Sequence, residues 1–273
     1  MIATELVKLF RRPRTWLTLV LLNALPILVA VLLAVTHAGP RPGQGPAFLS
    51  AVLSNGSLYS IAALAIVLPL FLPAAVAVIA GDAIAGEAQS GTLRYLLIRP
   101  VGRTRLLVAK LVAVLSFVLV AVVLVSGIGY ITGTVLLGDQ PLTASTAVAS
   151  VSGTELTANQ IAVRTVIAIG YVALSMLGVA AFALFLSTLT DSALSAGLGA
   201  LGLLIGSSLL LTLDAAKVLQ PYLPTRYWLS FIDLFRDPIL WRNIERGVAL
   251  QAVYVAVLLA AGWANFSTKD VTS

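Results

Sequence analysis

Residues 87–110 read EAQSGTLRYLLIRPVGRTRLLVAK, a basic and amphipathic stretch between two apolar parts of the chain. The flanking stretches 59–80 and 111–137 contain no Asp, Glu, Lys or Arg. Each is long enough for a helix that crosses a bilayer, which takes about 20 apolar residues. The pattern therefore predicts a charged loop at a membrane surface, between two spanning helices.

The composition of the whole chain supports a membrane protein. Of its 273 residues, 59% are hydrophobic and 10% are charged, and the mean hydropathy is +1.02. Soluble domains contain about 25% charged residues, so we expect a bilayer as the solvent. The formal net charge is +6, and we expect the charged residues to lie in loops, where they set the orientation of the chain in the membrane. The absence of cysteine excludes disulfides and thiolate ligands, and the single His37 excludes a histidine-cluster metal site.

Six apolar stretches predict an all-α integral membrane protein with six transmembrane helices in one domain, 1–273. Pro69 and Pro73 predict a kink in the second helix, because proline removes a backbone donor. The expected parts are an interfacial helix at 1–14, spans at 16–37, 57–82, 106–137, 161–188, 192–214 and 247–266, a coupling region at 83–105, and outer interfacial or re-entrant helices at 218–244.

Basic residues predict the orientation of the chain. With the N-terminus inside, ten basic residues face the cytoplasm and seven face outward. We expect a multi-pass protein of the bacterial plasma membrane, with both termini cytoplasmic. A signal peptide is the alternative for the N-terminus, but the apolar run after Arg12 is too long for one.

The stretch 87–110 has the pattern of a short helix. Thr92 can cap it, and Leu93, Leu96 and Leu97 then share one face. Pro100 ends the helix, and Gly102 allows a turn into the next span. The leucine face is too large to be buried within the segment, so it needs either a lipid surface or a partner protein.

The pattern E-x-x-x-G-T-L-x-x-L-L-x-x-P-x-x-R, followed by a lysine at the head of the next span, resembles the loop after the second span of ABC-2 type permeases, the membrane subunits of ABC exporters. The matching residues are Glu87, Gly91, Thr92, Leu93, Leu96, Leu97, Pro100, Arg103 and Lys110. The six spans and the chain length also fit. The resemblance implies a type V exporter-like transmembrane domain in which this segment is a coupling helix.

The same resemblance implies the partners. Two permease subunits, identical or paralogous, would surround a translocation path, and two ATP-binding cassette subunits would dock on the coupling helices. ATP and Mg would bind those ATPase subunits, because none of the four lysines of this chain follows a glycine, as a P-loop requires. We expect no enzyme activity and no cofactor on this chain. Spans without charge favour an amphipathic or hydrophobic cargo such as a drug, lipid, peptide or glycolipid.

Two other functions remain open. A secondary transporter usually carries an ionisable residue within a span, and the cores of these spans have none. A membrane enzyme that modifies lipids would need clustered acids, and Asp233 and Asp237 form the one pair at i,i+4 spacing, for which a surface role is the simpler interpretation.

Three further features are candidates for packing or gating. Small residues of the fifth span predict close helix packing, within the subunit or at a dimer seam: Gly197, Gly199, Gly202 and Gly206. Aromatic residues after that span are expected to anchor it in the headgroup zone or to gate the path: Tyr222, Tyr227, Trp228, Phe231, Phe235 and Trp241. Asn23 is expected to bond a neighbouring helix, and His37 to be interfacial.

Overall fold

The computed structural model describes residues 1–36, 56–91, 102–138, 148–149 and 155–268. Helices dominate these residues, and a small hairpin pairs two antiparallel strands with Val148 opposite Leu156. In chain order the elements are α1 (Ile2–Arg11), α2 (Pro13–Thr36), η1 (Gly56–Leu58), α4 (Tyr59–Val67), α5 (Phe71–Gln89), α7 (Arg103–Leu137), β1 (Val148–Ala149), β2 (Glu155–Leu156), α8 (Ala158–Leu189), α9 (Ala193–Leu210), η2 (Asp214–Ala216), η3 (Gln220–Tyr222), η4 (Trp228–Phe235) and α10 (Trp241–Thr268).

Six of these helices are long and apolar enough to cross a membrane: α2, α5, α7, α8, α9 and α10. The prediction of an all-α membrane protein with six spanning helices is therefore confirmed at this level. A helix is favoured in lipid because it satisfies its backbone donors and acceptors internally. Polar caps mark where two of them begin: Thr157 and Gln160 form a capping box before α8, and Ser192 caps α9.

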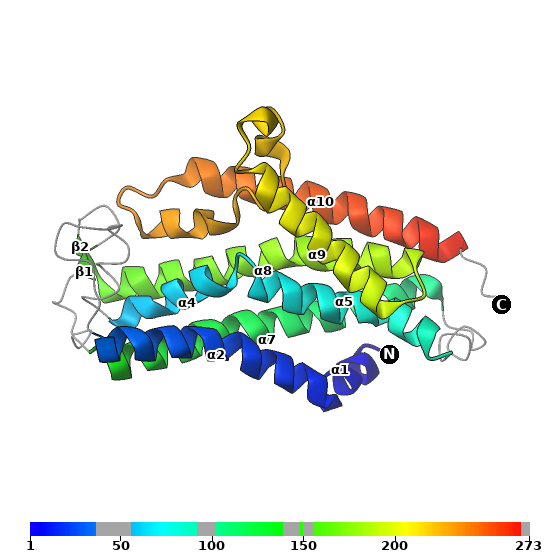
Figure 1. The fold of residues 1–273 in the computed structure, drawn as a ribbon, viewed down its shortest axis with the longest axis horizontal. Coiled ribbons are helices and arrows are strands. Elements are labelled where there is room, and N and C mark those ends of the chain that lie inside the picture. Colours follow the sequence, from blue (N-terminus) through cyan, green and yellow to red (C-terminus); the bar gives the residue numbers. More distant parts are fainter. Residues whose placement is uncertain (37–55, 92–101, 139–147, 150–154, 269–273) are drawn as a thin grey trace.

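The second apolar stretch is broken at 68–70, between α4 and α5. Pro69 and Pro73 lie at this break, and neither has the N–H that a continuous helix would use. The predicted kink is thus a full interruption. Figure 1 shows α4 and α5 following one another along the long axis of the molecule, so that the two pieces together run the length of one span.

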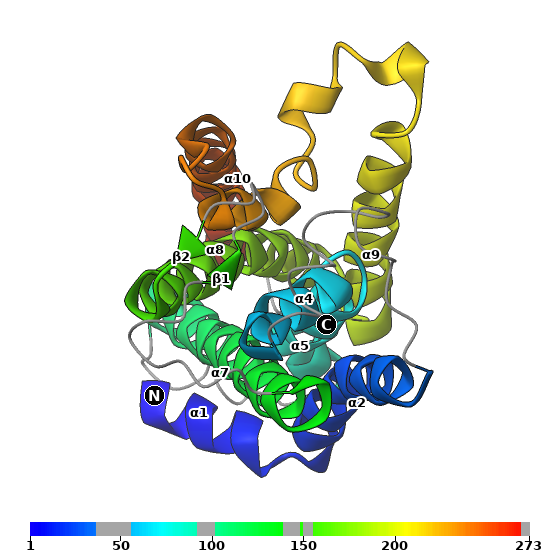
Figure 2. The same ribbon diagram turned by 90° about the vertical axis from the view of Figure 1, so that its left-hand side faces the viewer.

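Helix α8 packs against four of the long helices, α5, α7, α9 and α10. Figure 2 shows α1 and α2 on one side of the bundle, and α9 and α10 diverging on the other. The core is built from apolar side chains with no exposure, such as Phe117 on α7 and Met176 on α8. Helix α1, the end of α5, the start of α7 and the end of α10 all lie at one end of the molecule (Figure 1).

Helices α5 and α9 approach closely where Gly81 faces Gly197. A Cβ on Gly81 would lie 2.8 Å from the backbone N of Gly197, which leaves no room for a side chain. On the same turn of α5, the Ser187 hydroxyl of α8 donates to the Gly81 carbonyl at 2.7 Å and accepts from the Ala85 amide at 2.8 Å. These contacts fix α5 one to two turns before the charged segment begins.

The chain between α9 and α10 forms three short 3-10 helices, and two of them, η3 and η4, lie within the range 218–244 that was predicted for outer helices. Figure 1 shows η2 and η3 standing out from the side of the bundle and η4 running back along it. The backbone of Tyr222 accepts a hydrogen bond from Tyr254, which lies near the middle of α10. The segment therefore passes beside the middle of a spanning helix before it runs on to the start of α10.

Candidate functional site

The predicted coupling region is described at its two ends. Thr92, Leu93, Leu96, Leu97 and Pro100 lie outside the described residues, and so does the leucine face that they were predicted to form. Glu87, Gly91, Arg103 and Lys110 are described. Gly91 follows α5 with φ of 70°, a left-handed conformation that favours glycine, and its amide bonds the Ala88 carbonyl at 3.0 Å.

Four charged side chains form a network at the end of α5, and two of them, Glu87 and Lys110, are buried. Glu87 is 3% exposed and Lys110 is 2% exposed, and they pair at 2.9 Å. Glu87 also pairs with Lys8 of α1, and Lys110 pairs with Glu5 of α1 at 3.2 Å. Charges alternate from Lys8 to Glu87, Lys110 and Glu5, so each buried charge has an opposite partner, as burial in a low dielectric requires. The network joins α1, α5 and α7.

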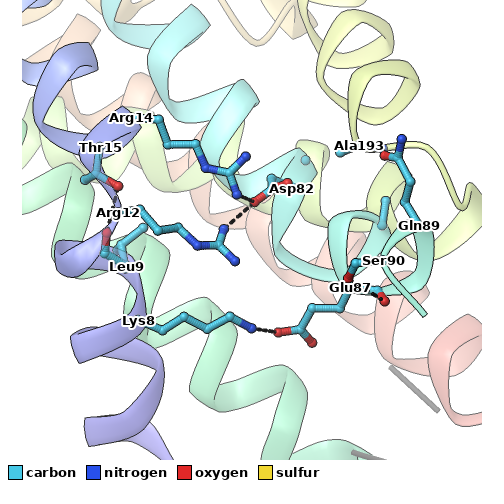
Figure 3. Close-up of polar contacts among 12 residues, drawn as sticks. Lys8, Leu9, Arg12, Arg14, Thr15, Asp82, Glu87, Gln89, Ser90 and Ala193 are labelled. Atoms are coloured by element: carbon cyan, nitrogen blue, oxygen red, sulfur yellow. Dashed lines mark hydrogen bonds and ion pairs between the residues drawn. The ribbon is translucent and has the colours of Figure 1, made fainter. Parts of the chain in front are cut away.

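A second set of ion pairs lies one turn earlier on α5. Arg12 and Arg14 both donate to Oδ2 of Asp82, each at 2.6 Å. Figure 3 shows Lys8, Arg12 and Arg14 reaching from the N-terminal helices towards Asp82 and Glu87. Helical spacing aligns Glu5 and Lys8 on one face of α1, whereas Arg12 is the extended residue between α1 and α2 and Arg14 lies in the first turn of α2.

The other end of the coupling region is attached to α10. The Arg103 guanidinium donates to the carbonyls of Phe266 and Ser267 at 3.2 and 2.8 Å, and so satisfies the C-terminal turn of that helix. Trp263 Nε1 donates to the Thr104 hydroxyl at 2.9 Å. Before the region, the Gln89 side-chain oxygen accepts from the first amide of α9, that of Ala193, at 3.4 Å. The two flanks of 92–101 are thus tied to α1, α7, α9 and α10.

Because its charged groups are paired with one another, this arrangement can hold the segment in position and pass a displacement of it to the neighbouring helices. A displacement of the segment would act on four helices through charged or hydrogen-bonded side chains. Among the described residues, no group of three or more His, Asp or Glu side chains could hold a metal ion.

The aromatic residues between α9 and α10 are divided between surface and core. Tyr222 is 67% exposed and Trp241 is 48% exposed, and Tyr227 is half-buried. Trp228, Phe231 and Phe235 of η4 are buried in the main hydrophobic core. These three side chains therefore pack inside the chain.

Side chains of α8 and α10 hold this irregular segment through its backbone carbonyls. Tyr171 donates to the carbonyl of Tyr227 at 2.6 Å, and Gln251 donates to that of Pro224 at 2.8 Å. Arg164 and Tyr254 make the same kind of bond, to Arg236 at 3.0 Å and to Tyr222 at 2.8 Å. We call these four the carbonyl clamp: Arg164, Tyr171, Gln251 and Tyr254. Sequence reasoning missed it, although Gln251 and Arg164 stand out as polar residues in apolar stretches.

The small residues of α9 have different surroundings. Gly197 packs on the backbone of α5, and a Cβ on Gly199 would lie 3.1 Å from Leu186 of α8. A Cβ on Gly202 or Gly206 would meet nothing within 4 Å among the described residues. Gly197 and Gly199 thus pack against other helices of the subunit. Gly202 and Gly206 leave their face of α9 open among the described residues.

Asn23 and His37 stand apart from these contacts. Asn23 is buried in α2, and its amide donates to the Leu19 carbonyl of its own helix at 2.8 Å. This differs from the expected bond to a neighbouring helix. His37 lies outside the described residues.

The family model of DUF2705, described as a protein of unknown function, matches residues 27–272. The chain belongs to the DUF2705 family. No curated protein matches it. In this DUF2705 chain the matched range contains Asp82, Glu87 and Lys110, but it begins after α1 and therefore leaves out the partners that α1 supplies to the charged network.

Proposed function

We propose that this chain is a permease subunit of an ATP-binding cassette transporter. With a second permease it would enclose a translocation path for an amphipathic or hydrophobic cargo, and separate ATPase subunits would supply the energy. The observation that carries the proposal is the buried pair of Glu87 and Lys110, at 2.9 Å. These two residues bracket the segment that resembles a coupling helix, so its two sides begin from one fixed point on the bundle.

The attachments around that segment support a role in transmission. A motor that pushed on 92–101 would move Glu87 on one side and Arg103 on the other. Glu87 acts on α1 and α7 through its lysine partners, and Arg103 acts on the end of α10. The contact of Gln89 with the start of α9 adds a fourth helix. A passive surface loop would not need both flanks tied in this way.

A groove beside the helix break supports an apolar path. It is lined by Pro69, Leu70 and Pro73 at the break and by Leu201, Ile205 and Leu209 of α9. Gly202 and Gly206 lie on the same helix and leave room for a second helix to approach. We assign this side of the molecule to the second permease and to the cargo.

The test is recovery of an ATPase partner from membranes. Leu96→Asp and Leu97→Asp together should abolish recovery of an ATP-binding cassette subunit, because an unpaired charge would be buried at the interface. The complex recovered with the unaltered chain should hydrolyse ATP, and the purified chain alone should not.

The matched control is Val218→Asp with Leu219→Asp, which places two charges at exposed positions between α9 and α10. This variant should reach the membrane and retain the partner. Undiminished recovery with the substitutions at 96 and 97, or hydrolysis by the chain alone, would contradict the proposal.

A further inference from the structure

A pocket lies beneath α1, where that helix meets the end of α5 and the start of α7. Its rim is charged and includes Lys8, Arg12 and Arg14, which Figure 3 shows pointing towards α5. Its floor is apolar and is formed by Ile79, Ala113 and Val114 of the spanning helices. The pocket is therefore amphipathic, with the apolar part on the side of the spans.

The charges around the pocket leave donors unused. Four basic and three acidic side chains line it, which is an excess of one positive charge. Arg12 and Arg14 share a single oxygen of Asp82, although each guanidinium carries five N–H donors. Their side chains are 32% and 54% exposed, and in the described part of the chain neither bonds any other acceptor.

The positive end of α2 adds to this field. Helix α2 begins at Pro13, between the two arginines, and Thr15 of its first turn also lines the pocket. The first turn of a helix attracts anions, because the helix dipole is positive there. Two partly exposed guanidinium groups at such a position suit a phosphate, which arginine can bind through two parallel hydrogen bonds.

The apolar surroundings favour a lipid over a free anion. Trp16 and Leu17 at the start of α2 are 53% and 59% exposed, and Ile2 and Val7 of α1 are exposed as well. A soluble phosphate would leave this exposed apolar surface uncovered. A phospholipid would cover them with its acyl chains while its phosphate met the arginines, at the level where the spanning helices end.

We propose that the pocket beneath α1 binds the headgroup phosphate of an anionic phospholipid, such as phosphatidylglycerol, in the leaflet on the α1 side. The bound phosphate uses the free donors of Arg12 and Arg14 and offsets the excess positive charge. It thereby stabilises the attachment of α1 to the bundle. The assignment rests on the pocket alone and does not depend on the transport role.

The test measures thermal unfolding of the purified chain in a neutral detergent, with phosphatidylglycerol, phosphatidylcholine or inorganic phosphate added. Phosphatidylglycerol should raise the unfolding temperature, and the other two should not. Arg12→Gln with Arg14→Gln should weaken the affinity for phosphatidylglycerol about tenfold, since charge-assisted bonds to the phosphate are lost. The matched control, Arg242→Gln with Arg246→Gln, removes two exposed arginines of α10 and should change nothing.

Three results would overturn the proposal: an equal response to the two lipids, an unchanged affinity in the Arg12 and Arg14 variant, or protection by inorganic phosphate that matches the lipid. The last result would assign the pocket to a free phosphate. If the double variant does not fold, Arg14→Gln alone is decisive, because that side chain is more than half exposed. The assay contains no ATPase, so its outcome is separate from that of the partner recovery experiment.

Discussion

The two ends of the bundle are fastened by different chemistry. At the α1 end, charged side chains on regular helices pair with one another, as Glu87 does with Lys8 and Lys110. From the middle of the spans towards the other end, the carbonyl clamp attaches side chains of α8 and α10 to the backbone between α9 and α10. Ion pairs join elements whose backbones are already satisfied, whereas the clamp supplies donors to a backbone that lacks regular partners. The ion-paired side chains can exchange one another for other charged partners. The backbone carbonyls need the donors of the carbonyl clamp wherever the segment is shielded from water.

The largest effect is expected from Glu87→Leu. The substitution leaves Lys110, which is 2% exposed, with Glu5 as its remaining partner. Removing one member of a buried pair costs about 3–5 kcal/mol, which unfolding in a graded denaturing detergent should detect.

Adding Lys110→Leu to Glu87→Leu should restore part of that stability, because the unpaired charge disappears. The control is Glu245→Gln, at an exposed position of α10. If the double variant were no more stable than Glu87→Leu alone, desolvation of the unpaired Lys110 would not be the cause.

A smaller effect is expected from Gln251→Leu in the carbonyl clamp. The Pro224 carbonyl would lose its donor, at a cost of about 1–2 kcal/mol. The same unfolding assay measures it, with Val253→Leu on the exposed side of α10 as the control. A loss greater than that of Glu87→Leu would reverse the ranking of the two regions.

The smallest effect is expected from Arg14→Gln, because the Arg14 side chain is 54% exposed. Its pairing with Asp82 should contribute less than about 1 kcal/mol in a double-mutant cycle with Asp82→Asn. At 1 M salt, where the screening length is about 3 Å, the coupling energy of Arg14 and Asp82 should fall further. The coupling energy of the buried pair of Glu87 and Lys110 should stay unchanged. If salt weakened both ion pairs equally, burial would not be the cause of their different strengths.

The sequence predicted the spanning helices well because lipid imposes a minimum length of apolar residues, which hydropathy detects. It also located the weak point of the second span, since Pro69 and Pro73 remove backbone donors whatever their surroundings. Glu87 and Lys110 were found through the motif, yet nothing in the pattern indicated that they pair or that Lys8 joins them. That contact spans 79 positions in the chain, and local periodicity carries no signal over such a separation.

The aromatic segment shows a different limit of prediction. Trp228, Phe231 and Phe235 belong to residue types that suit both a headgroup zone and a protein core, so composition alone could not separate the two. The structure buries them because η4 returns along α8 and α10. The hydrogen-bond donors that hold this segment, Tyr171 and Gln251, lie on α8 and α10. The sequence does not show that they lie beside the segment, because this depends on how the helices pack.

The length of α9 has a consequence for the bilayer itself. Its 18 residues span roughly 27 Å, less than the hydrocarbon thickness of about 30 Å. Beyond its last turn the chain carries Asp214 and Lys217, whose charges must reach headgroups or water. The uncharged residues 211–213 lie between them and the helix, and they extend this side to about the hydrocarbon thickness with little to spare. A thicker bilayer would therefore be mismatched first beside α9, and later on the opposite face, where α2 has 24 residues.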